Sequence, residues 1–123
     1  MKQLLLVATG GALGSVARYL CQKGLSIAWL HPIPWATFIV NIVGCLLIGI
    51  FWGIRFGSFD ANENWKLFLM TGLCGGFTTF SAFTLEGIGL LKEQKTFLFF
   101  LYVAGSVVLS LLATWSGMKI SRI

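Results

Sequence analysis

Four hydroxyl side chains recur at intervals of four residues in the last quarter of the chain. They are Tyr102, Ser106, Ser110 and Thr114. Residues four apart lie one above another on a helix, so a helix here would carry the hydroxyls as one ridge. Ordinary hydrogen bonding between helices explains one or two such residues. Four in register favour a polar track through a helix bundle.

An amide and two aromatic rings could serve the same chemistry. Asn41 is the only amide in the apolar stretch 35–54, one turn after Thr37, and it offers two N–H donors without a formal charge. Because such a donor is neutral, it would bind an anion weakly enough to let it pass. Phe80 and Phe83 are three residues apart and so lie on one helix face. They are either apolar filler or present electropositive ring edges to an anion.

The stretch "TGLCGGFTTFSAFTLEG" combines adjacent glycines with adjacent threonines. Gly75 and Gly76 remove side-chain constraint, and the β-branched Thr78 and Thr79 are poor helix formers. The pattern predicts a helix broken in mid-membrane, a feature that supplies carbonyls and helix ends to ions. The alternative is a simple kink.

Composition decides the environment of these residues. The chain is 57% hydrophobic and 11% charged, with a mean hydropathy of +0.87, whereas soluble domains carry roughly 25% charged residues. Its basic residues are scattered, which argues against nucleic-acid binding. There is no nucleotide motif, catalytic constellation or metal-ligand cluster, so we expect no enzyme. The neutral donors fit a small, strongly hydrated anion better than a cation.

The sequence predicts an all-α membrane protein with one transmembrane domain over residues 1–123. A span needs ~20 mostly apolar residues, and the predicted spans cover residues 3–22, 35–54, 66–91 and 96–118. The linkers between them are short. His31 lies in the first linker, and we expect it to be inert.

The basic residues are divided almost evenly between the two sides of the membrane. With four spans, one side receives Lys2, Arg55, Lys66, Lys119 and Arg122, and the other receives Arg18, Lys23, Lys92 and Lys95. Orientation follows such a bias, which is nearly absent here. Either weak signals set one orientation, or the chain inserts both ways. Two subunits of opposite orientation could then pair about an axis in the membrane plane.

Three motifs give the chain a family resemblance. They are "GGALGSVARY" at 10–19, "TFIVNIVG" at 37–44 and "GLCGGFTTFSAF" at 72–83, followed by Glu86 and the hydroxyl ridge. The whole chain resembles the Fluc/CrcB family of fluoride channels. One departure is "FSAF" in place of the more usual "FSTF", which removes a hydroxyl at Ala82.

The resemblance implies passive fluoride export through a multi-pass protein of the bacterial cell membrane. It implies an antiparallel homodimer with two fluoride pathways. It also implies roles for individual residues: Asn41 as a fluoride donor, Phe80 and Phe83 as an aromatic box, Ser110 and Thr114 in the polar track with Tyr102 and Ser106 further along, Arg18 in an entrance vestibule, and the carbonyls of Gly75 and Thr78 around a structural sodium ion at the dimer centre.

Two other functions stay open at this point. A small proton-coupled multidrug exporter is also built from four short helices, but it needs an acidic residue in mid-membrane. The first predicted span has none, and Glu86 comes late in the third. A non-conducting accessory membrane protein would not need the hydroxyl ridge. Arg18 and Glu86, the charges within the spans, either snorkel to the membrane surface or pair with a partner.

Overall fold

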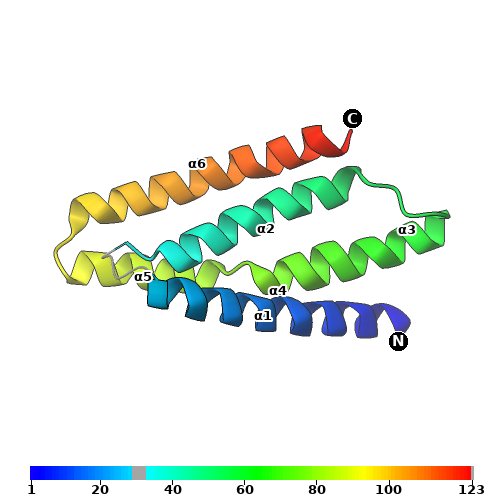
Figure 1. The fold of residues 1–123 in the computed structure, drawn as a ribbon, viewed down its shortest axis with the longest axis horizontal. Coiled ribbons are helices and arrows are strands. Elements are labelled where there is room, and N and C mark those ends of the chain that lie inside the picture. Colours follow the sequence, from blue (N-terminus) through cyan, green and yellow to red (C-terminus); the bar gives the residue numbers. More distant parts are fainter. Residues whose placement is uncertain (29–32, 123) are drawn as a thin grey trace.

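The computed structural model describes residues 1–28 and 33–122, and His31 lies outside them. Four helical spans run alternately in opposite directions, with α2 between α6 and the third span (Figure 1). The third span consists of several helical segments. The helices are α1 (Lys2–Ala28), α2 (Trp35–Gly53), α3 (Phe59–Lys66), η1 (Leu67–Cys74), α4 (Gly75–Phe77), α5 (Phe80–Lys92) and α6 (Thr96–Ser121).

All four predicted spans are confirmed as helices long and apolar enough to cross a membrane. They cover Lys2–Ser26, Trp35–Gly53, Phe59–Lys92 and Thr96–Ser121. Few side chains are buried between them: Val40, Cys74, Phe83, Leu90 and Tyr102 form the apolar core. Many other large apolar side chains face outward, as expected for a multi-pass membrane protein whose solvent is lipid.

The third span begins earlier than predicted. The predicted spans leave residues 55–65 as a linker, but α3 starts at Phe59. Ser58 caps this helix, because its Oγ accepts a hydrogen bond from the Ala61 N–H at 3.4 Å. Asp60 adds an acidic group to the first turn, where the helix dipole favours it. Ser58 and Asp60 are therefore a signal for a helix start, which hydropathy alone does not detect because many of the residues around them are polar.

The third span is broken, as predicted from the adjacent glycines and threonines, and the break lies at Thr78 and Thr79. Gly75 keeps helical angles (φ −62°, ψ −39°). Thr78 (φ −82°, ψ 155°) and Thr79 (φ −146°, ψ 115°) are extended. Extended backbone suits β-branched side chains, so the threonines and not the glycines interrupt the helix. The preceding segment η1 is a π-helix, a form often found beside functional sites.

Close backbone contacts at glycines join the spans into two pairs, α1 with the third span and α2 with α6. A Cβ on Gly14 of α1 would collide with the Leu73 carbonyl oxygen, and one on Gly76 would lie 2.5 Å from the Gly11 oxygen. On the other side, a Cβ on Gly49 of α2 would collide with the Thr114 carbonyl of α6. Such close approach of backbones is typical of glycine-lined helices in membranes. The α1 pair fixes η1 and α4, and the α2–α6 pair fixes the hydroxyl ridge.

Candidate functional site

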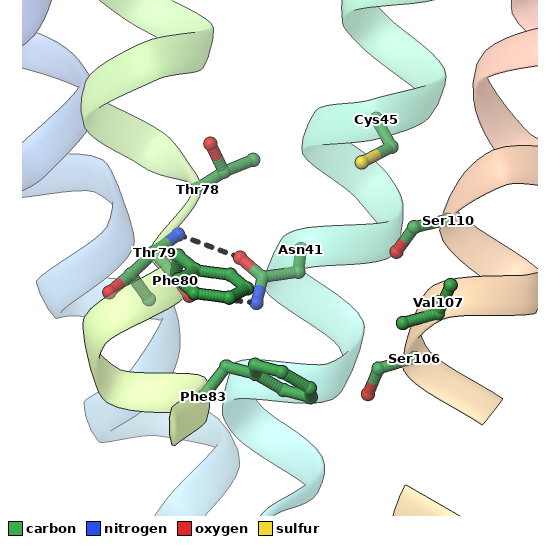
Figure 2. A pocket seen from close by; sticks show the side chains of 9 residues that line it. All are labelled: Asn41, Cys45, Thr78, Thr79, Phe80, Phe83, Ser106, Val107 and Ser110. Atoms are coloured by element: carbon green, nitrogen blue, oxygen red, sulfur yellow. Dashed lines mark hydrogen bonds between the residues drawn. The ribbon is translucent and has the colours of Figure 1, made fainter. Parts of the chain in front are cut away.

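A cavity of about 270 Å³ lies where α2, α6 and the break in the third span meet. Its lining holds most of the residues singled out from the sequence and no charged side chain (Figure 2). The lining residues are Asn41, Cys45, Thr78, Thr79, Phe80, Phe83, Ser106, Val107 and Ser110. The fold therefore brings together the amide, both phenylalanines and two of the four ridge hydroxyls, from segments up to 69 residues apart in sequence.

Asn41 holds the break through a reciprocal pair of hydrogen bonds. Its Oδ1 accepts from the Thr79 N–H at 2.7 Å, and its Nδ2 donates to the Thr79 oxygen at 3.0 Å (Figure 2). The Asn41 amide thus bonds both the N–H and the carbonyl oxygen of Thr79, which in a continuous helix would have backbone partners. Because the Asn41 amide has two N–H groups, one donor remains beyond the bond to Thr79.

The break also changes the hydrogen-bond partners of two backbone N–H groups, those of Thr79 and Ala82. In an α-helix the Thr79 N–H would bond the Gly75 oxygen, and the Ala82 N–H would bond the Thr78 oxygen. Here the Thr79 N–H donates to Asn41, and the Ala82 N–H donates to Thr79 Oγ1 at 3.1 Å. The carbonyls of Gly75 and Thr78 therefore lose their usual helical donors, as the sequence-based sodium prediction requires.

Arg18 compensates a third carbonyl at the same place. Its Nε donates to the Gly76 oxygen at 3.1 Å, and the side chain is half-buried. This contact answers one question left open by the sequence, because Arg18 pairs with backbone instead of extending freely to the membrane surface. Its role in an entrance vestibule stays a prediction.

Three aromatic rings continue from the break toward α6. Phe80 and Phe83 lie with ring centroids 5.6 Å apart, and Phe83 lies 5.2 Å from Tyr102. Their planes are tilted by 39° and 40°, so ring edges as well as faces are presented to neighbours. Phe83 is buried, whereas Phe80 is 77% exposed on the open side of the cavity. The two predicted box residues therefore have different surroundings within one protomer.

The four ridge hydroxyls separate into three roles. Ser106 and Ser110 line the cavity. The Ser106 Oγ is buried, and it has no hydrogen-bond partner among the described residues. Thr114 instead donates to the Cys45 carbonyl at 3.1 Å, an ordinary bond between α6 and α2. Tyr102 is 1% exposed and points its hydroxyl at Glu86.

A second polar cluster lies next to the cavity and was not predicted. Glu86 accepts hydrogen bonds from the Thr37 hydroxyl at 2.8 Å and from the Tyr102 hydroxyl at 3.2 Å. The Gln22 Nε2 in turn donates to Thr37 Oγ1 at 3.1 Å. This chain of contacts links α1, α2, α5 and α6. Its signal in the sequence is weak, because Glu86 and Thr37 belong to different predicted spans and nothing in their spacing joins them.

A comparison with known families now decides the family. Residues 5–118 match the model of the family described as CrcB-like protein, camphor resistance. The chain belongs to the CrcB family. Among curated CrcB relatives, a protein of Flavobacterium psychrophilum named fluoride-specific ion channel FluC is 47% identical over 99% of this chain and 98% of its own length. The proteins of the same name in Phocaeicola vulgatus and Rhizobium etli are 46% and 43% identical, over 99% of this chain and 100% and 98% of their own lengths.

Proposed function

We propose that this chain forms a fluoride-selective channel that lets fluoride leave the cell passively across the cell membrane. The observation that carries the proposal is the cavity at the break, which neutral donors and aromatic rings line. The buried Ser106 hydroxyl has no partner there among the described residues, and such a group costs about 1–3 kcal/mol when left unsatisfied. An anion passing through the cavity would accept a hydrogen bond from this hydroxyl.

The start of α5 adds a favourable field without adding a charge. Thr79 caps α5 and lines the cavity together with Phe80, the first residue of the helix. A helix N-terminus carries partial positive charge. Because the lining holds no lysine or arginine, binding stays weak enough for the ion to leave, as conduction requires.

The names of the relatives support the same function. Each of the three is named a fluoride-specific ion channel, which is a transport activity and not a catalytic one. The exporter alternative would need its proton-carrying acid at Glu86. That carboxyl already accepts two side-chain hydrogen bonds and does not line the cavity.

Fluoride efflux from liposomes containing the purified protein tests the proposal. Wild-type protein should release trapped fluoride rapidly, without needing a proton gradient. Asn41→Asp should abolish release, because a carboxylate at the break repels the passing anion. Asn62→Asp is the matched control, since it makes the same change in α3, outside the cavity, and should leave efflux unchanged. No efflux from the wild type, or full efflux from Asn41→Asp, would contradict the proposal.

The functional unit is proposed to be an antiparallel homodimer embedded in membrane lipid. Support comes from the near-even division of basic residues and from the open side of the cavity, where Phe80 is 77% exposed. A second copy would close that side. Cysteine labelling from each face of the membrane, with the native cysteines changed to serine, should find both orientations in similar amounts. A single orientation would refute the antiparallel pairing.

A structural sodium ion at the centre of that dimer is the remaining part of the proposal. The carbonyls of Gly75 and Thr78 would hold it, and both have lost their α-helical donors to Asn41 and Thr79. Gly75 is exposed, so a second subunit could approach it. Neutral oxygen ligands suit a monovalent cation. Sodium-free buffer should weaken the dimer or the flux, and indifference to sodium would exclude the site.

A further inference from the structure

A second cavity, of about 570 Å³, lies at the end of the molecule where α2 and α6 finish and α3 begins. Three cationic side chains line it: Arg55, Lys66 and Arg122. We call it the basic cavity. Figure 1 shows these helix ends together at one end of the bundle, with the two chain termini. The basic cavity therefore lies at the end of the spans, away from the break, and shares no lining residue with the cavity described above.

The charges of the basic cavity are not neutralised by acidic side chains. Within residues 1–28 and 33–122, neither Arg55 nor Arg122 makes an ion pair or a side-chain hydrogen bond. The nearby acids, Asp60 and Glu63, line a different cavity together with Lys2. The two acids of α3 thus line a different cavity from Lys66, which lies on the same helix.

Lys66 is held in place by contacts that keep its charge in the basic cavity. Its Nζ donates to the Trp52 carbonyl at 3.1 Å and lies 5.2 Å from the centre of the Trp52 ring. Both arginines remain exposed, with their guanidinium groups available. Guanidinium groups bind phosphate through paired N–H donors. The arrangement offers one anchored cation and two forked donors for a single anionic group.

The surroundings indicate where that phosphate comes from. Trp52 and Phe59 line the same cavity and are 52% and 79% exposed. Tryptophans at the ends of membrane spans, such as Trp52, lie at the level of the lipid headgroups, and basic pockets between spans bind anionic headgroups. We propose that the basic cavity binds the phosphate of an anionic phospholipid, with the acyl chains running along the apolar outer surface of α2 and α6.

Native mass spectrometry of the purified protein titrated with phosphatidylglycerol or phosphatidylcholine tests this site. Phosphatidylglycerol should bind more tightly to the wild type. Arg55→Gln and Arg122→Gln should each weaken its binding about fivefold, as expected for one basic residue near an anionic lipid. Lys92→Gln, which removes an exposed cation at the end of α5 and outside the basic cavity, should leave binding unchanged.

Two results would overturn the assignment. One is equal binding of the two lipids by the wild type, a measurement that does not depend on any variant folding. The other is displacement of phosphatidylglycerol by millimolar inorganic phosphate, which would make the basic cavity a site for a soluble oxyanion. Loss of fluoride efflux would not affect either measurement, so this inference and the proposed function can fail separately.

Discussion

The two halves of the third span are held in the protein by different means. The first half, η1 and α4, lies against α1 through glycine backbones, as at Gly14 and Gly76. The second half, α5, is held by side chains, through Asn41 at its start and Glu86 further along. Backbone contact leaves no room for adjustment. Polar side-chain contacts can exchange partners, which a pathway for an ion requires. The contrast suggests a fixed half and an adaptable half.

The largest expected effect comes from placing a methyl group in the fixed half. Gly14→Ala would drive a Cβ into the Leu73 carbonyl oxygen and to within 2.8 Å of the Phe77 nitrogen. We expect a loss of about 3 kcal/mol or more in stability, because backbone cannot move aside as a side chain can. Thermal unfolding in detergent measures it.

The matched control for Gly14→Ala is Gly89→Ala in the adaptable half. No atom lies within 4 Å of a Cβ at Gly89. This variant should be unchanged or more stable by up to about 1 kcal/mol, because alanine favours a helix. Similar melting of the two variants would remove the distinction between the halves.

The next effect concerns the contacts that hold α5. Thr37→Val removes the donor to Glu86 and the acceptor for Gln22. It should cost about 1–3 kcal/mol, since the half-buried Gln22 amide loses this acceptor and the half-buried Glu86 carboxyl loses one of its two donors. Thr9→Val is the control, because Thr9 is exposed and its hydroxyl bonds only to its own helix, and that change should stay within about 0.5 kcal/mol. Equal melting temperatures for the two valine variants would argue against the Glu86 cluster.

A smaller effect is expected on flux from the aromatic pair. Phe80→Ile removes a ring beside the cavity at similar bulk. An aromatic interaction is worth about 0.5–1.5 kcal/mol, so fluoride efflux should fall roughly two- to tenfold. Phe97→Ile changes a ring of matching exposure, 78% against 77%, at the start of α6 and outside the cavity. If both variants conduct like the wild type, Phe80 is apolar filler.

The smallest effect tests whether the hydroxyl ridge is one unit. Thr114→Val removes the bond to the Cys45 carbonyl. Hydrogen bonds between membrane helices contribute about 0.6 kcal/mol on average, so stability should fall slightly while efflux stays near the wild-type rate. A strong loss of efflux would place Thr114 in the pathway after all, together with Ser106 and Ser110.

Patterns of one helix could be read from the sequence, whereas relations between helices could not. Hydropathy predicted the four spans, and the paired threonines indicated the break. The four hydroxyl residues do lie in one helix at four-residue intervals, but their spacing does not predict which neighbouring helix each hydroxyl contacts. Tyr102 turned out to meet Glu86, and Thr114 meets α2.

The Asn41 contact shows the same limit at the site itself. Asn41 and Thr79 lie 38 residues apart, and no local rule joins an amide to an extended residue at that distance. The position of the break depends on this long-range pair as well as on local propensity. The adjacent glycines contributed to the predicted break, but Gly75 keeps helical angles and Gly76 lies against Gly11 of α1.

The depth of the Asn41–Thr79 contact has an electrical consequence. Asn41 comes six residues after the start of α2 at Trp35, or ~9 Å along a helix of ~28 Å. The Asn41–Thr79 contact therefore lies nearer one end of α2 than the other. In the antiparallel dimer proposed above, the two copies of this contact would lie at opposite depths, and ions would meet the same barriers in reverse order. The rectification of one pathway would cancel that of the other, giving a symmetric current–voltage relation.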